Sequence, residues 1–192
     1  MRCENFLSFM NDEINLRYEE IYKKVEKAYQ ENAEKTESSF IQKMDELFMR
    51  CYKKQLEGVK KSIKYIMIYP LKMGFLGGSY EVMVSLLDIG CYDDRKEVST
   101  YWIPEYLIPV IKEEREYYEK SLEKQFIRVM EYEKKDALRC MFEEYYFKPL
   151  KEFFEGQIEN CKRLESYHTM QKEEDIVFLY GNYMDEMDEL AE

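Results

Sequence analysis

The sequence predicts an all-α protein: an antiparallel bundle of about four long helices with a short helical hairpin insert and a small C-terminal helix. Turn formers are scarce, with 7 Gly and 4 Pro in 192 residues, whereas an all-β sandwich needs a turn every ~8–12 residues. Charged residues make up 36% of the chain and hydrophobic residues 45%. Apolar residues recur with helical spacing along most of the chain, which favours amphipathic helices.

Residues 5–33 form the first expected helix, because apolar side chains recur there every seven residues. A narrow stripe of this kind over three heptads is typical of a coiled-coil seam. We therefore expect the chain to form a homodimer through this helix. The self-association seam consists of Leu7, Ile14, Ile21 and Ala28.

The second expected helix begins near residues 36–39, where Ser39 and Gln42 have the spacing of a capping box. It ends or kinks near Pro70, because the proline ring lacks an N–H and clashes with the preceding turn. No Gly or Pro occurs between Met1 and Leu56. A single continuous helix over residues 5–69 therefore remains an alternative.

Residues 70–102 form an apolar connector in which helical spacing breaks down. Residues 65–87 are apolar enough to suggest a membrane span, but they contain Lys72, Glu81 and several Gly residues. Two central charges would each cost about 2.5–3.5 kcal/mol in a bilayer. We expect a buried helical hairpin here, with its second helix over residues 79–87.

The second half of the chain predicts a third long helix that opens around Pro104 or Pro109, a residue suited to a first helical turn. A fourth long segment covers residues 136–168, and Pro149 should kink it near Tyr145. A short helix over residues 174–180 follows. It ends the helical part of the chain.

These elements predict one helical domain over residues 1–182. Two helical-hairpin halves, residues 1–69 and 103–170, are joined by the connector of residues 70–102. Residues 183–192 form an acidic C-terminal tail.

The charge of the chain is unevenly distributed. The net charge is −11, but residues 173–192 contain eight acidic residues and no Lys or Arg. The remaining body is nearly balanced. A general nucleic-acid-binding protein needs a clear cationic excess, so we expect no nucleic-acid partner.

The cysteines and the single histidine predict neither catalysis nor a metal site. The five cysteines show no paired spacing, which favours reduced thiols and a cytoplasmic location. Glu165 and His168 have the spacing used by di-iron bundles, but such sites need two histidines. No local signature supports Cys91 and His168 as a catalytic pair. We expect no catalytic residue, metal ligand or cofactor.

Two surface features could bind partners. A basic stripe of six cations interrupted by Glu57 would lie on one helix face and bind anions or an acidic segment. The acidic tail could dock on this stripe as an amphipathic clasp, or it could fray in solvent. The basic stripe consists of Arg50, Lys53, Lys54, Lys60, Lys61 and Lys64, and the clasp of Met184, Met187 and Leu190.

These features favour a non-enzymatic cytoplasmic protein that acts through protein–protein interaction or regulation. An alternative is a helical bundle that binds a small apolar or aromatic ligand, because the chain has 18 Tyr, 11 Phe and 12 Met. A third alternative is a peripheral membrane-surface binder that uses residues 65–87 and the basic stripe. Membrane contact is the least favoured of the three.

Overall fold

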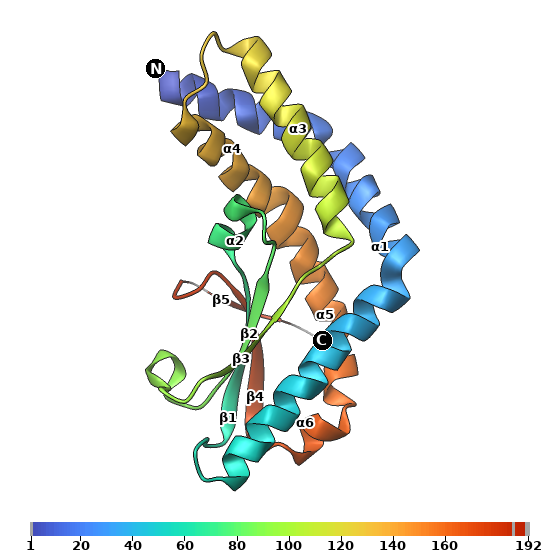
Figure 1. Ribbon diagram of the computed structural model, residues 1–192, viewed down its shortest axis with the longest axis vertical. Coiled ribbons are helices and arrows are strands. Elements are labelled where there is room, and N and C mark those ends of the chain that lie inside the picture. The colour runs from blue at the N-terminus through green and yellow to red at the C-terminus, as the bar shows by residue number, and fades with distance from the viewer. Residues whose placement is uncertain (1, 186, 191–192) are drawn as a thin grey trace.

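The computed structural model describes residues 2–185 and 187–190, with side chains from residue 6 onward. It shows a mixed α/β fold in which helices cover a five-stranded sheet (Figure 1). The predictions of an all-α helical bundle and of a coiled coil are therefore wrong. Strands replace the expected helical hairpin of residues 70–102 and the expected helix of residues 174–180.

The sheet has the strand order β3-β2-β1-β4-β5. Its first three strands form an antiparallel meander, whereas β4 pairs with β1 in parallel and β5 pairs with β4 in antiparallel orientation. The segment of chain that connects the parallel strands β1 and β4 is a long crossover that contains most of the helices. The strands are β1 (Ile63–Pro70), β2 (Val82–Leu87), β3 (Val98–Trp102), β4 (Lys172–Gly181) and β5 (Met187–Glu189).

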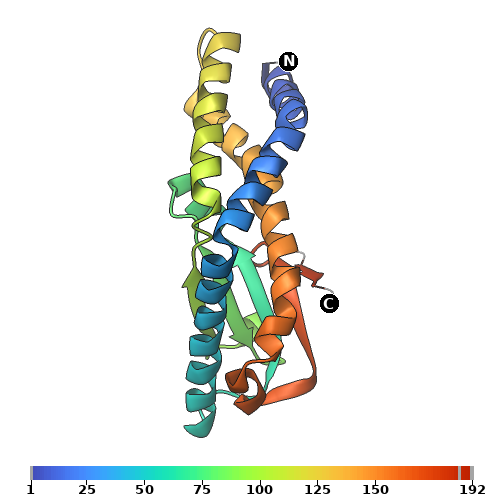
Figure 2. The same cartoon turned by 90° about the vertical axis from the view of Figure 1, so that its right-hand side faces the viewer.

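The helices form one layer against the sheet and extend beyond it as an arm made of the first half of α1, α3 and α4 (Figure 1). Figure 2 faces this layer and shows α1 lying between α3 and α5. The helices are α1 (Arg2–Leu56), α2 (Lys72–Gly77), α3 (Leu107–Gln125), α4 (Glu131–Phe142), α5 (Lys148–Lys162) and α6 (Glu165–Thr169), with a 3₁₀ turn η1 (Cys91–Asp93) and a π-helical turn η2 (Glu143–Phe147).

The first two expected helices are one continuous helix, α1, which ends at Leu56 rather than near Pro70. Gly58 follows with a positive φ of 68°, a conformation that favours glycine and ends the helix. The seam residues Ile14 and Ile21 are buried in the core of the same chain. The heptad stripe thus packs on the chain's own helices.

The connector was misassigned because short apolar runs fit either a strand or a buried helix. Strand β1 has the sequence IKYIMIYP, rich in the β-branched and aromatic residues that favour strands. Ile66 and Ile68 belong to the main core, whereas Met67 and Tyr69 belong to a small cluster on the opposite face. Because both faces are covered, the strand lacks a polar side that would reveal its period.

The interruption that Pro149 predicts is the π-helical turn η2, which immediately precedes α5. A proline in a helix cannot donate to the carbonyl four residues back and crowds it, and the wider turn accommodates this defect. The turn directs two tyrosines into the core. Tyr145 Oη donates to Ile14 O at 3.1 Å, and Tyr146 Oη donates to Tyr80 O at 2.7 Å.

Residues 65–87, considered above as a membrane span, form strands β1 and β2 with the short helix α2 between them. Among the helices of the described residues, none has both the length and the hydropathy to cross a bilayer.

Candidate functional site

The basic stripe does not lie on one helix face, because α1 ends before its last three cations. Arg50 donates to Ser99 O at 2.6 Å. Lys60 is buried and forms an ion pair with Asp94. Lys64 forms an ion pair with Asp175 at 2.5 Å. Three of the six cations thus have intramolecular partners. The other three cations of the basic stripe are Lys53, Lys54 and Lys61.

The proposed clasp residues lie on a turn and a strand rather than on a helix. Met184 is exposed, Met187 begins β5, and Leu190 is buried with its N–H donating to Phe178 O at 2.9 Å. In the acidic segment, Asp175 meets the basic stripe at Lys64. Positions 186 and 191–192 of the predicted tail lie outside the described residues.

The homodimer through the seam remains a prediction. Leu7 is partly exposed, but Ile14 and Ile21 are buried within the single chain, and Ala28 packs against the same core. A dimer formed by Ile14 and Ile21 would require α1 to separate from α3 and α4.

The structure places Cys91 and His168 in different surroundings. Cys91 packs with the small cluster that contains Met67 and Tyr69, whereas His168 lies on α6 with its ring 5.8 Å from that of Tyr167. Within residues 2–185 and 187–190, no three Asp, Glu, His or Cys side chains are grouped to hold a metal ion.

Two hollows flank α1, and Tyr106 lines both. The larger, about 640 Å³, lies between α1 and the segment that joins β3 to α3. Its lysines already have partners, because Lys35 pairs with Glu105 at 2.6 Å and Lys43 pairs with Glu46 at 3.2 Å. This groove therefore has little unsatisfied charge.

The smaller hollow, about 420 Å³, lies between α1 and α5, and we call it the acidic pocket. Four aromatic rings and three carboxylates line it together with apolar and amide side chains. The rings are those of Tyr22, Tyr29, Tyr106 and Phe153, the carboxylates are Glu26, Glu37 and Glu152, and the other lining residues include Pro149, Gly156, Gln157 and Asn160.

Tyrosine hydroxyls hold two of the carboxylates in place. Tyr22 Oη donates to Glu152 Oε2 at 3.1 Å, and Tyr29 Oη donates to Glu37 Oε1 at 2.5 Å. Burial, together with the hydrogen bond to Glu37, raises the pKa of Tyr29 to about 12. Tyr29 is therefore a neutral donor near neutral pH, and Glu37 is the acceptor.

The negative charge of the acidic pocket is not compensated. The lining residues include no Lys or Arg. In the part of the chain that the structure describes, none of Glu26, Glu37 and Glu152 forms an ion pair. Three formal negative charges thus line one pocket without an ion-pair partner among the described residues.

Two nearly buried side chains of the pocket each have one polar atom that bonds to no described residue. Tyr106 is 5% exposed and Gln157 is 4% exposed. No described residue forms a hydrogen bond with Tyr106 Oη, and the Gln157 amide engages only its Oε1, which accepts from Asn160 Nδ2 at 3.0 Å. Burial, then Tyr29 and Glu152, raise the pKa of Tyr106. Among the described residues, the fully buried side-chain atom without a partner is Ser166 Oγ, so Tyr106 Oη and Gln157 Nε2 retain solvent access and are free to bond a ligand group.

The acidic pocket was missed in the sequence, although its parts follow helical spacing. On α5, Glu152, Phe153 and Gly156 lie three, four and seven residues after Pro149, so all four share one face. The abundance of aromatic residues was the available signal. It could not identify the face of α1 that lies opposite.

Gly156 offers a first prediction. A Cβ at this position would meet no heavy atom within 4 Å, and glycine in a helix costs about 0.8–1 kcal/mol relative to alanine. The Gly156→Ala variant should therefore raise the melting temperature by about 2–4 °C. Thermal unfolding followed by circular dichroism measures this change. An unchanged or lower melting temperature would contradict it.

Comparisons with known proteins add no functional information. Searches against protein-family models, curated protein sequences and solved structures gave no significant match. Functional inference therefore rests on the geometry and charge of the acidic pocket.

Proposed function

We propose that this chain is a non-enzymatic binding protein and that the acidic pocket is its binding site. The observation that supports this most directly is the Tyr106 side chain, 5% exposed at the edge of a hollow of about 420 Å³, whose hydroxyl bonds to no described residue. Ligand pockets are commonly about 300–1,000 Å³ and combine aromatic walls with a few converging polar groups. This proposal resembles the sequence-based alternative of a small apolar or aromatic ligand. However, the three carboxylates of the pocket favour a ligand that is more polar than that alternative supposes.

A cytoplasmic location is part of the same proposal. The four cysteines whose side chains the structure describes are all free. Unpaired thiols are typical of proteins from a reducing compartment.

Trp102 is a natural reporter for ligand binding. It is the only tryptophan of the chain, and its ring stacks on that of Phe153 with centroids 5.2 Å apart and an interplanar angle of 8°. Since Phe153 lines the acidic pocket, a ligand that displaces this ring should change the fluorescence of Trp102. A panel of small organic cations, anions and neutral aromatic compounds can be screened in this way.

The Gly156→Phe variant tests whether binding occurs in the acidic pocket. The added ring would extend from a position with no heavy atom within 4 Å, so it should fill the pocket without disturbing the core. We expect compounds selected on the native protein to bind Gly156→Phe at least about tenfold more weakly, a loss of about 1.4 kcal/mol.

Gly156→Ala is the matched control, because it adds a Cβ but leaves the pocket open. It should bind as the native protein does. The proposal is wrong if no compound of any charge class binds the native protein, or if Gly156→Phe binds as well as Gly156→Ala. Circular dichroism of both variants verifies that they are folded.

A further inference from the structure

We propose that the acidic pocket binds an organic cation with N–H donors, namely an alkylammonium or guanidinium group on an alkyl stem. The inference rests on the proposed function and specifies the ligand class of the same site. The group belongs either to a free amine or to a Lys or Arg side chain of a partner protein. Both have the same chemistry, and the experiment below separates them.

The charge of the acidic pocket favours a cation. Glu26, Glu37 and Glu152 surround the pocket, and the lining residues include no Lys or Arg. Elsewhere in the chain, the acidic residue Glu114 is buried with both Arg17 and Lys24 bonded to it. The pocket carboxylates lack such a partner among the described residues, so a ligand cation would complete the arrangement.

The aromatic wall of the acidic pocket also favours a cation. The ring of Tyr29 lies 5.5 Å from that of Tyr106 and 5.9 Å from that of Phe153, measured between centroids. Aromatic faces attract cations through their quadrupole, and they also pack against alkyl stems. The combination of rings and carboxylates is thus complementary to a cation with an apolar body.

The pocket carboxylates have free hydrogen-bond acceptor positions for a ligand with N–H groups. Tyr22 and Tyr29 each occupy only one acceptor position on Glu152 and Glu37. A carboxylate has about four such positions, so several remain for ligand N–H groups. The Tyr106 hydroxyl can accept an N–H of the ligand.

The arrangement suits an organic cation better than a metal ion. The described residues contain no group of three potential metal ligands close enough to hold one ion. The carboxylates instead belong to separate parts of the pocket wall, Glu26 and Glu37 on α1 and Glu152 on α5. An extended ligand with more than one N–H group can reach carboxylates on both helices.

The test measures the binding of defined probes by the fluorescence of Trp102. Agmatine supplies a guanidinium and an ammonium on one alkyl stem. Choline, a cation without N–H groups, and its uncharged isostere 3,3-dimethylbutan-1-ol isolate the effect of charge from that of hydrogen bonding. Short capped peptides containing Arg, or uncharged citrulline in its place, represent a partner side chain. Glu152→Gln and Glu37→Gln remove charge but keep an acceptor for Tyr22 and Tyr29.

We expect agmatine to bind the native protein and each glutamine variant to weaken its binding about tenfold, since hydrogen bonds to charged groups contribute about 1.5–3 kcal/mol. The isostere should bind at least about tenfold more weakly than choline. Glu159→Gln is the matched control, because Glu159 is exposed on the same helix and does not line the pocket. It should change agmatine binding less than about twofold.

The outcomes separate this inference from the proposed function. Neutral or anionic compounds could bind and be blocked by Gly156→Phe while the glutamine variants have no effect. In that case the cationic ligand class is wrong, but the acidic pocket remains the binding site. If no probe of any class binds, both proposals fail. If agmatine binds but neither Gly156→Phe nor the glutamine variants weaken it, the cation binds elsewhere and the inference is overturned. Tighter binding of the Arg peptide than of agmatine would identify a protein side chain as the source, and the reverse a free amine.

Discussion

Replacement of Asp94 by Ala is expected to lower the free energy of unfolding by about 3–5 kcal/mol, because it leaves a buried ammonium without its counter-charge. The side chains of Lys60 and Asp94 are 0% and 3% exposed, and they form an ion pair. Lys60 also donates to Leu86 O at 2.9 Å. That single remaining acceptor cannot replace the carboxylate.

Asp94 additionally organises the loop between β2 and β3. Its Oδ2 accepts from the N–H of Asp88 at 3.0 Å, and its Oδ1 accepts from the N–H of Lys96 at 2.9 Å. Denaturant unfolding followed by Trp102 fluorescence measures the loss of stability. Asp93→Ala is the control, because Asp93 is exposed, and it should change stability by less than about 0.5 kcal/mol. Equal losses in the two variants would contradict a structural role for the ion pair.

The same ion pair predicts how stability depends on pH. Burial alone would raise the pKa of Asp94, but Lys60 and the two backbone N–H groups outweigh it and lower the pKa below its usual value. A depressed carboxyl pKa stabilises the fold above the unfolded value of about 3.9, and this stabilisation is lost as the pH falls through the folded value. As the pH falls below about 4, the free energy of unfolding of Asp94→Ala should therefore decrease less than that of the native protein.

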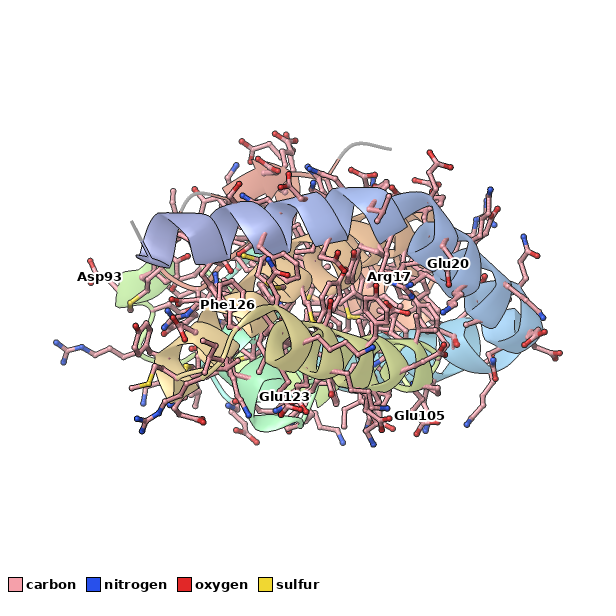
Figure 3. The ribbon with its side chains drawn as sticks, turned by 90° about the horizontal axis from the view of Figure 1, so that it is seen from above. Arg17, Glu20, Asp93, Glu105, Glu123 and Phe126 are labelled. Atoms are coloured by element: carbon pink, nitrogen blue, oxygen red, sulfur yellow. The ribbon has the colours of Figure 1, made fainter. Side chains whose placement is uncertain are left out.

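Replacement of Glu114 by Gln is expected to cost about 2–3 kcal/mol, because hydrogen bonds to charged groups contribute about 1.5–3 kcal/mol. Glu114 lies on α3 with its side chain 0% exposed. Arg17 on α1 donates to both of its oxygens, at 3.0 and 2.9 Å, and Lys24 lies 3.1 Å from one of them. Figure 3 shows Arg17 between α1 and α3. The glutamine side chain has nearly the same volume as that of glutamate. However, one of its two terminal atoms is an N–H donor, which cannot accept a hydrogen bond from Arg17 or Lys24.

The neighbouring residue Glu113 is a matched control for this measurement. It contacts the same Lys24 at 2.9 Å, but its side chain is 64% exposed. An exposed pair contributes about 0–1 kcal/mol, so Glu113→Gln should be nearly neutral in denaturant unfolding. If Glu113→Gln proved as destabilising as Glu114→Gln, burial would not be the cause.

The helices were the part of the fold that local sequence predicted best. A first helix without Gly or Pro, a helical interruption before Pro149 and a helix near Pro109 all follow from backbone chemistry within a few residues. The strands were not predicted, because β1 pairs with β4 across about a hundred residues, as in Ile66 with Phe178. Local periodicity contains no information about a partner so far along the chain.

Lys60 and the seam show how packing changes the meaning of a local pattern. The helical pattern assigned Lys60 to an exposed basic stripe, but α1 ends at Leu56, and Lys60 turns inward to Asp94. The seam residues Ile14 and Ile21 were correctly recognised as apolar positions of one helix face. The partner of that face was decided by α3 and α4 of the same chain, which no heptad spacing specifies.

The acidic pocket shows the same division. Helical spacing alone places Tyr22, Glu26 and Tyr29 on one side of α1, and Glu152 and Gly156 on one side of α5, since neighbours three or four residues apart share a face. The packing of α1 against α5 brings these two faces together around one hollow. Local backbone geometry determines which side chains share a face, whereas long-range burial of apolar surface determines which faces meet.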